Sequence, residues 1–426
     1  MKGALMRPQS LVIALVTLLT LPSHAKLEAH EWGTFTSLVG SNGITQDGMV
    51  HEDEVLPSFV HEFGELRQEV PVQPPLQPRP RPCRNKICFG DDFFENNVVT
   101  QKMETPVIYF YADRAQKVSV NVRFPEGVIT QTFPGPVRTS PTRADIQRLV
   151  NGNTTFDVEV LNSKQGLFPA VDSSNIYNHA RLVASNAIRS GAEEEKFIFY
   201  RGIGRFQPKM SIQSKGGRLE MEADPNQLPQ AAFLVHVSEN GEGQILALKL
   251  LPQLGRQALE PAILEALKNH QGPSIVGAVR GEQARGMLVD ALINSGLFRD
   301  EAFAMINTWE HGYLKVPGLR LLYVLPSNEV EEILPLTMTP VPDKLVRSFV
   351  GRIEILLDTE EQRVLGQILS QGESFQPESL GRFAEPILRR VREVSATMPL
   401  FDPAHTLLLN QLVERAKKAE FVSNLE

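Results

Sequence analysis

The sequence predicts an α+β protein, in which a β-rich, sandwich-like unit at residues 26–255 precedes an α-rich unit with a few strands at residues 256–426. Two patterns lead to this prediction. Apolar and polar side chains alternate over residues 117–124, which is the period of a half-buried strand. Leucine and isoleucine recur at helical spacing over residues 259–267. The boundary between the two units is therefore expected near residue 255.

The first 25 residues have the layout of a secretory signal peptide. Lys2 and Arg7 give a basic start, and an uninterrupted apolar run follows at Leu11–Leu21. This run is too short to cross a bilayer as a helix, which takes about 20 residues. Small residues at the end of the segment favour cleavage after Ala25, so that the mature chain begins at Lys26.

A second cleavage position lies after Ala29, and its use would place His30 at the N-terminus, where amine and imidazole could bind copper together. We expect this position to be used less, because Lys26 and Glu28 would then lie inside the cleavage region. The rest of the sequence has no segment that approaches a membrane span. We therefore expect a periplasmic or secreted protein without a membrane span after signal cleavage.

The β-rich unit is expected to begin with EWGTFTS, in which Trp32, Thr34 and Thr36 alternate with their neighbours. The Pro-rich insertion at residues 70–82 holds six prolines and predicts a stiff spacer, with a recognition site for a proline-binding module as the alternative. Further strands are expected in TPVIYFYA, KVSVNVRFP, GVITQTFPGP, EKFIFYRGIG, KMSIQSKGGRLEMEA and AFLVHVSENGEGQILALKLL. Gly-Gly and Asn-Gly in the last two segments predict hairpin turns.

The chain has two cysteines, Cys83 and Cys88, just after the Pro-rich insertion. In an oxidising compartment they are expected to form a local disulfide. Zinc binding or redox use is the alternative. It is disfavoured because the spacing is not C-x-x-C and no second pair is present.

The α-rich unit is expected to alternate helices with two buried strands. The strands are GLRLLYVLP and VRSFVGRIEIL. Helices are expected around residues 284–292, from Asp300, from Asp358, over residues 378–395 and from Asp402 onward. We expect Asp300 and Asp358 to act as caps and Pro386 to kink the helix that contains it.

Charge and motifs exclude several classes of function. The net charge of −7 argues against a nucleic-acid partner, which would be matched by a basic patch. The sequence contains no H-E-x-x-H, G-x-S-x-G or G-x-x-x-x-G-K-[ST] motif. These absences disfavour the common zinc protease, serine hydrolase and P-loop signatures, although a site assembled from scattered residues would escape such a search.

His-Glu pairs are dense near the start of the mature chain and suggest a metal site. Imidazole and carboxylate together suit zinc or copper, and they can also act as an acid and base pair. We hypothesise that two histidines converge and that a carboxylate completes the site. The candidate ligands are His30, His61, Glu31, Glu62 and Glu104. The alternative is a solvated acidic surface with ordinary histidines.

Several segments together resemble a family of exported bacterial proteins without an assigned function. These segments are HEWGTFTS, METPVIYFY, GLFRDEAFAMINTW, GLRLLYVLP, ILPLTMTP and VGRIEIL. The resemblance covers most of the mature chain and implies a shared fold and export. It implies no catalytic residues.

Two classes of function remain. The first is an envelope or extracellular binding protein with a protein or other envelope partner, which we favour. The second is a periplasmic metal-dependent hydrolase or oxidase with its site on the β-rich unit. An enzyme predicts a deep pocket with convergent polar groups, whereas a binding protein predicts a shallow exposed apolar patch. Catalytic residues, the cofactor and the oligomeric state do not follow from the sequence.

Overall fold

The computed structural model describes residues 26–52, 54–63, 65–67, 97–142, 146–215, 218–250, 255–259, 264, 267, 278–398 and 402–419. The predicted signal peptide, the Pro-rich insertion and both cysteines lie outside these residues. The fold is α+β, as the sequence predicted.

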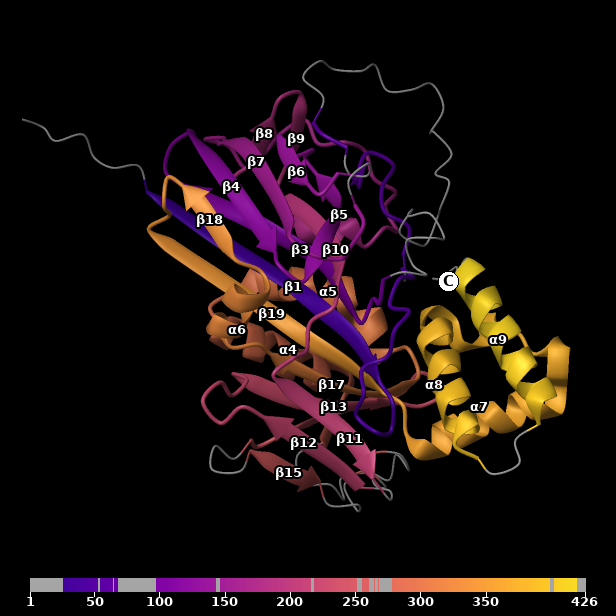
Figure 1. Cartoon of the computed structure of the whole chain (residues 1–426). Coiled ribbons are helices and arrows are strands. Elements are labelled where there is room, and N and C mark those ends of the chain that lie inside the picture. Colours follow the sequence, from indigo (N-terminus) through magenta and orange to yellow (C-terminus); the bar gives the residue numbers. More distant parts are fainter. Residues whose placement is uncertain are drawn as a thin grey trace, which may run out of the picture.

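A sheet of ten strands runs through the centre of the molecule (Figure 1). From edge to edge it contains β16 (Ala278–Arg280), β14 (Gly243–Ala247), β13 (Ala231–Val237), β17 (Gly318–Val324), β19 (Lys344–Ile355), β1 (Leu27–Val39), β3 (Gln101–Ala112), β10 (Ile198–Gly204), β5 (Gly127–Phe133) and β2 (His61–Glu62). β1 and β19 are parallel, and the other described neighbours in this sheet are antiparallel.

Two smaller sheets flank the central one. The first has the order β18 (Leu336–Thr339), β4 (Gln116–Phe124), β7 (Gly152–Val160), β8 (Ile188–Ser190) and β9 (Glu193–Glu195), with β6 (Arg138–Ser140) also paired to β7. The second contains β11 (Met210–Lys215), β12 (Arg218–Ala223) and β15 (Arg256–Leu259). Leu259, which was predicted to start a helix, therefore ends a strand, while Leu264 and Leu267 are helical.

The helices are short to medium in length. They are α2 (Tyr177–Arg181), α4 (Gly281–Asn294), α5 (Arg299–Leu314), α6 (Ser327–Ile333), α7 (Asp358–Gln371), η2 (Gly372–Ser374), η3 (Pro377–Phe383), α8 (Ala384–Ala396) and α9 (Pro403–Lys418). Among the described residues, none of these helices combines the length and the apolar character that crossing a membrane requires.

Strand β1 confirms the prediction for EWGTFTS and ties the two ends of the sequence together. It is buried along almost its whole length, because neighbours cover both faces and both edges. Its parallel partner β19 comes more than 300 residues later, and a parallel pair needs a long crossover. The central sheet therefore crosses the boundary that was expected near residue 255. A separate β sandwich confined to the first unit is not confirmed.

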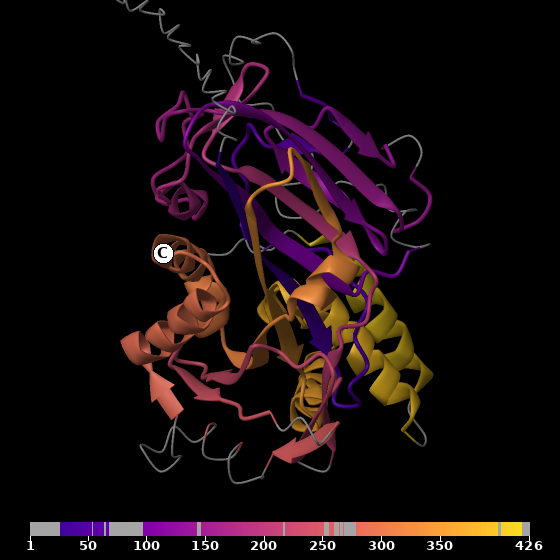
Figure 2. The same ribbon diagram turned by 90° about the vertical axis from the view of Figure 1, so that its left-hand side faces the viewer.

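Alternating side chains of the central sheet fill two different cores. Ala29, Phe35 and Phe349 belong to the core beneath the two smaller sheets, whereas Trp32 and Val350 belong to the core beneath α2, α4 and α5. Figure 2 shows α4 and α5 on one side of β1 and the strands of the smaller sheets on the other. This period of two assigns Thr34 and Thr36 to the same face as Trp32, which is covered by helices.

The C-terminal helices α7, α8 and α9 have a core of their own and sit at one end of β1 (Figure 1). α9 begins after Asp402, where the sequence predicted a helix, and Asp402 caps it by accepting a hydrogen bond from the Ala404 amide at 2.8 Å. Pro386 does not kink a helix. It lies in the first turn of α8, where a missing amide costs little, and the chain bends instead at Gly381, whose φ is +61°.

The start of α5 also differs from the prediction. Phe298 is its N-cap, and the side chain of Glu301 accepts a hydrogen bond from the Phe298 amide at 2.6 Å. Asp300 does not cap this helix. Its carboxylate accepts a hydrogen bond from the Ala184 amide at 2.8 Å and so links α5 to the segment after α2.

Candidate functional site

The structure does not bring the predicted metal ligands together. His30 lies on β1 and His61 on β2, and β3, β10 and β5 separate these two strands. At about 4.8 Å per strand, the two residues are roughly 19 Å apart. In the described part of the chain, no group of three or more His, Cys, Asp or Glu side chains could hold a metal ion. The metal hypothesis is therefore wrong for these residues.

His30 is instead part of a buried hydrogen-bond group. Its Nδ1 lies 2.8 Å from Oε2 of Glu301, which also accepts a hydrogen bond from the hydroxyl of Tyr111 through its other oxygen at 2.7 Å. The imidazole packs against the ring of Phe298, with 4.5 Å between the ring centroids. These contacts fix β1 to the first turn of α5, so His30 has a structural role.

The other predicted ligands also have partners of their own. Glu31 accepts hydrogen bonds from the Tyr200 hydroxyl and, at 2.6 Å, from Nε of Arg347. Nε2 of His61 lies 2.6 Å from Oε1 of Glu193. Glu62 is half-buried, and its carboxylate accepts a hydrogen bond from the side-chain amide of Gln131 (Nε2) at 3.5 Å. The two cysteines lie outside the described residues, so the disulfide remains a prediction.

The fifth predicted ligand, Glu104, leads to a different site. It belongs to a row of buried charged side chains that crosses the helix-covered face of the central sheet, from β17 to β10. We call this row the charged belt. Its members are Lys102, Glu104, Arg201, Arg320, Arg352 and Glu354 from the sheet, together with Glu52 and Arg382 from outside it. All are at most 7% exposed.

A bulge in β3 shapes the middle of this belt. Trp32 and Thr34 of β1 face Val107 and Glu104, so Gly33 alone opposes the two intervening residues of β3. A Cβ atom at Gly33 would lie only 3.0 Å from the Pro106 ring, which explains the glycine. Thr105 has φ of +48°, a strained conformation for a β-branched residue. Such strain is concentrated at functional sites.

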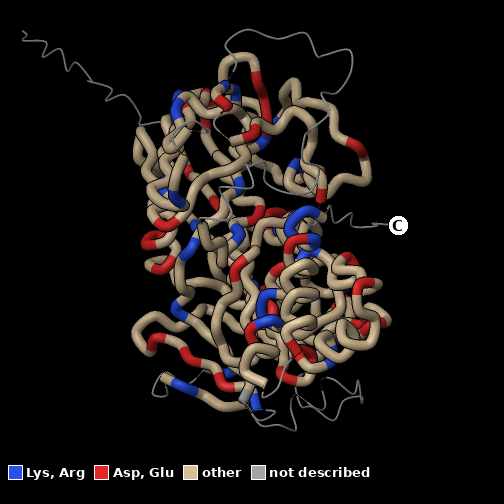
Figure 3. The backbone as a smooth tube through the Cα atoms, turned by 45° about the vertical axis from the view of Figure 1, so that its right-hand side comes forward, with Lys and Arg blue, Asp and Glu red and all other residues tan. Residues whose placement is uncertain are grey.

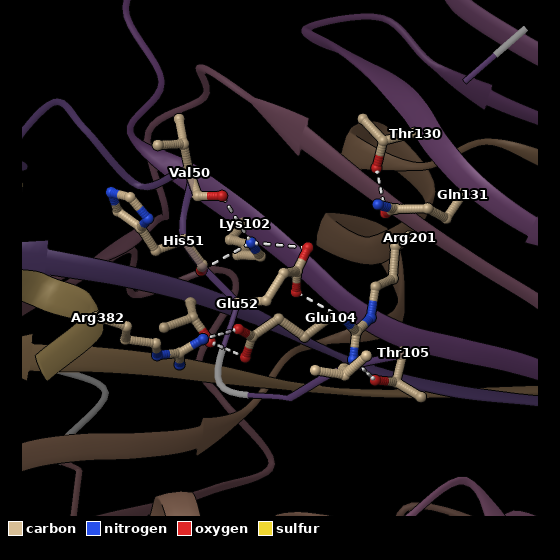
Figure 4. A network of polar contacts seen from close by, with 12 residues as sticks. Val50, His51, Glu52, Lys102, Glu104, Thr105, Thr130, Gln131, Arg201 and Arg382 are labelled. Carbon is tan, nitrogen blue, oxygen red and sulfur yellow. Dashed lines mark hydrogen bonds and ion pairs between the residues drawn. The ribbon is translucent and has the colours of Figure 1, made fainter. Parts of the chain in front are cut away.

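Glu104 connects the belt to the C-terminal helices. Its carboxylate accepts a hydrogen bond from the Thr36 hydroxyl at 2.7 Å. It also accepts one from Nη1 of Arg382 (Figure 4). Burial alone would raise the pKa of Glu104, but the charge and hydrogen bond of Arg382 outweigh it and lower the pKa to about 2. Glu104 is therefore a fixed negative charge at neutral pH and a poor candidate for a general acid or base.

Glu52 is shared by two cations. Its Oε1 lies 3.0 Å from Nζ of Lys102, and its Oε2 lies 2.6 Å from Nη1 of Arg201. Lys102 also donates to the backbone carbonyl of His51 at 2.8 Å, as Figure 4 shows. Burial lowers the pKa of Lys102, and the nearby charge of Glu52 opposes this effect. Lys102 reaches no pocket through these contacts, because all three of its donors point at protein oxygens.

The far end of the belt links the neighbouring strands β17 and β19. Glu354 lies 3.0 Å from Nε of Arg320 and 2.6 Å from Nε of Arg352. Burial alone would raise the pKa of Glu354, but the charges of these two arginines outweigh it and lower the pKa. Arg320 also donates to the carbonyl of Gly312 at 2.6 Å, near the C-terminal end of α5. This end of the belt is structural.

At the other end, Arg201 reaches a small pocket between α2 and β10. The pocket is lined by aromatic and apolar side chains together with the polar residues Glu54, Thr105, Asn175, Arg201 and Thr308. Its cavity of about 10 Å³ is close to what one water molecule needs. Nη2 of Arg201 donates to the Thr105 hydroxyl at 3.3 Å. Nε of Arg201 is buried and meets no acceptor among the described residues.

This arrangement favours recognition over catalysis. The unpaired Nε is a donor that costs about 1–3 kcal/mol when it is left without an acceptor. The ionisable belt groups nearest the pocket, Glu52, Lys102 and Glu104, are held in ion pairs. The pocket therefore offers a hydrogen-bond donor and an apolar surface, while the acids and bases of the charged belt beside it are paired with one another.

Sequence reasoning missed the belt, although two of its members left a signal. Arg201 and Arg352 are charged residues inside runs that otherwise predict buried strands. A charge at such a position is rare unless it is paired. What the sequence could not supply was the pairing, because the belt forms only when β3, β10 and β19 are assembled around β1.

No protein-family model matches this chain, and no curated protein matches it. Along the described chain, Lys and Arg are interspersed with Asp and Glu in both the β-rich and the helical parts, as Figure 3 shows.

Proposed function

We propose that this protein is exported to the periplasm or secreted, and that it binds a small ligand there without converting it. The binding site is the pocket between α2 and β10. The observation that carries this proposal is the union, in one pocket, of the aromatic side chains Phe197, Phe199 and Tyr177 with the buried donor Nε of Arg201. An apolar pocket with a few convergent polar groups is the usual form of a ligand site.

The export part of the proposal rests on the basic and apolar segments at the start of the sequence. The binding part rests on geometry. The cavity of about 10 Å³ is too small for a ligand larger than water, so the proposal requires the surface segment at residues 54–56 to move outward when a ligand enters. Val55 in this segment is 45% exposed and has little core packing to lose. Because only open molecules bind, the apparent dissociation constant equals the intrinsic dissociation constant divided by the fraction of molecules that are open.

Saturation-transfer NMR with butyramide and butyrate as probes tests the binding site. We expect signal from the wild-type protein and none from Ile176→Trp, because Ile176 is half-buried, lines the pocket and would block it when enlarged. Leu369→Trp is the matched control, since Leu369 is 40% exposed on α7, outside the pocket. Equal signals from both variants, or no signal from wild type, would overturn the proposal.

Catalysis is tested on the same variants. Wild-type protein incubated with 4-nitrophenyl butyrate should release nitrophenol no faster than Ile176→Trp. Hydrolysis that wild type and Leu369→Trp share and Ile176→Trp lacks would contradict a function limited to binding.

A further inference from the structure

The polar groups of the pocket indicate which class of ligand it binds. The starting point is the single unused donor of Arg201. Nη1 is held by Glu52 at 2.6 Å and Nη2 by the Thr105 hydroxyl at 3.3 Å, which leaves Nε. Arg201 is 3% exposed, and Nε meets neither solvent nor a described acceptor. The same side chain lines the pocket.

Thr105 provides a second donor at the same place. Its hydroxyl oxygen accepts from Arg201, so its own hydrogen is available to another acceptor. The bulge places Thr105 in the lining of the pocket, at the cost of the strained φ of +48°. Arg201 and Thr105 are therefore two donor-bearing residues in one lining, and an acceptor with two lone-pair directions, which a carboxylate has, can satisfy both.

The charge around Arg201 favours an anionic acceptor over a neutral one. Glu52 carries one negative charge and is shared between Lys102 and Arg201. One of these two cations is therefore without full compensation within this group of three. Glu54 also lines the pocket and opposes an anion there, so it offers a direct electrostatic control.

The side chains that line the pocket determine which chemical group can follow the acceptor in the ligand. Among these side chains, Val107, Phe197 and Phe199 are fully buried, whereas Val55 and Leu56 are more exposed. These side chains offer no further polar group for a ligand tail. A short hydrocarbon chain fits this apolar part of the lining, where a sugar or a phosphate would lose hydration without replacement. The polar residues Asn175 and Thr308 line another part of the pocket.

We propose that the pocket binds a short apolar carboxylic acid, with its carboxylate at Nε of Arg201 and the Thr105 hydroxyl and its alkyl chain against Phe197 and Phe199. This inference rests on the proposed function and narrows it. The carboxylate replaces the water that the small cavity can hold, and the alkyl chain occupies the space opened by the segment at residues 54–56.

The test compares butyrate with its neutral isostere butyramide on the full-length mature protein by NMR titration. We expect wild type to bind butyrate about tenfold or more tightly than butyramide, since a hydrogen bond to an ionised group is stronger. Arg201→Lys keeps the charge that faces Glu52 but removes Nε, so it should lose this preference. Arg347→Lys is the matched control, because Arg347 has a side chain that is only 6% exposed and is paired with Glu31 outside the pocket.

Two more variants keep the test decisive if Arg201→Lys folds poorly. Thr105→Gly removes the hydroxyl and relieves the positive φ, so it should weaken butyrate binding in a folded protein. Glu54→Gln removes an opposing charge and should tighten butyrate but not butyramide. Equal affinity of wild type for both probes would overturn the carboxylate inference while leaving the proposed binding function intact. Absence of binding by either probe would overturn both.

Discussion

Arg382 of η3 donates a hydrogen bond to Glu104 of β3, a residue that lies 278 positions earlier in the chain. This contact joins the C-terminal helices to the central sheet at the bulge that also strains Thr105. The guanidinium stacks on the ring of Phe383 at 4.7 Å, so the arginine is held from both sides. The charged belt is thus both the anchor of the helical unit and the neighbour of the pocket.

Removing the charge of Glu104 should destabilise the whole protein. In Glu104→Gln, Arg382 loses its buried counter-ion, and breaking a buried pair typically costs about 3–5 kcal/mol. Urea unfolding followed by circular dichroism measures this change. Glu360→Gln is the control, since the Glu360–Arg363 pair is about half exposed and should contribute less than about 1 kcal/mol. A similar small effect of both variants would contradict the role given to Glu104.

The same pair predicts an acid-dependent loss of stability. The pKa of Glu104 is lowered from 4.5 to about 2 in the folded protein. A carboxyl group whose pKa is lowered by folding stabilises the protein fully above its unfolded pKa, and this contribution is lost as the pH falls toward the folded pKa. The difference in unfolding free energy between wild type and Glu104→Gln should therefore shrink between pH 4.5 and 2. A difference that stays constant over this range would refute the assignment.

The sequence predicted the elements of this fold better than their assembly. EWGTFTS predicted β1 because its alternation is local, and Asp402 predicted the start of α9 because a cap acts on the next turn. The pairing of β1 with β19 has no such local signal, since each strand is buried on both faces along most of its length and neither sequence names its partner. Because the sequence does not reveal this pairing, it suggested two separate units divided near residue 255.

The candidate site shows the same limit at the level of side chains. His30 and Glu31 are neighbours in sequence, but on a strand they point to opposite faces, one toward Glu301 and the other toward Tyr200. The presence of His and Glu side by side in the sequence therefore did not indicate that their side chains meet at one point. The signal for the real cluster was the charge inside apolar strands, such as Arg201 in EKFIFYRGIG.

His30 should prove structural when it is replaced. In His30→Ala, Glu301 loses a hydrogen bond while its carboxylate stays buried, so we expect a loss of about 3 kcal/mol. In a double-mutant cycle with Glu301→Gln, the two changes should be non-additive, because each removes the same contact. Metal analysis provides the second readout. A metal content that is present in wild type and absent in His30→Ala would restore the ligand hypothesis against this geometry.

The two cysteines give a prediction that is independent of the described residues. If Cys83 and Cys88 form a disulfide, the unreduced protein should be lighter by about two hydrogens than the reduced protein, with no free thiol after denaturation. The loop between them is short, and closing it should change stability by roughly 2 kcal/mol or less, because the entropic effect grows with loop length. A double serine variant should therefore keep its thermal unfolding cooperative. Loss of the folded state in that variant would contradict a local role.

The start of the mature chain is the last prediction, and the structure adds a reason to choose between the two cleavage positions. Cleavage after Ala29 would remove Leu27, which is 1% exposed, together with the Glu28 pairings to both β3 and β19. Burying a leucine contributes about 1.5–3 kcal/mol. Cleavage after Ala25 keeps these contacts.

Cleavage after Ala25 also creates a free amine in a suitable place. The Lys26 nitrogen lies 3.2 Å from a carboxylate oxygen of Asp113, and the next amide donates to Asp343 at 2.8 Å. N-terminal sequencing of the exported protein should therefore read Lys-Leu-Glu. Because the Lys26 contact is exposed, Asp113→Asn should lower stability by less than about 1 kcal/mol without moving the cleavage position. If the first residue were His30, β1 would start later than its pairing with β3 and β19 predicts. An uncleaved chain would contradict export.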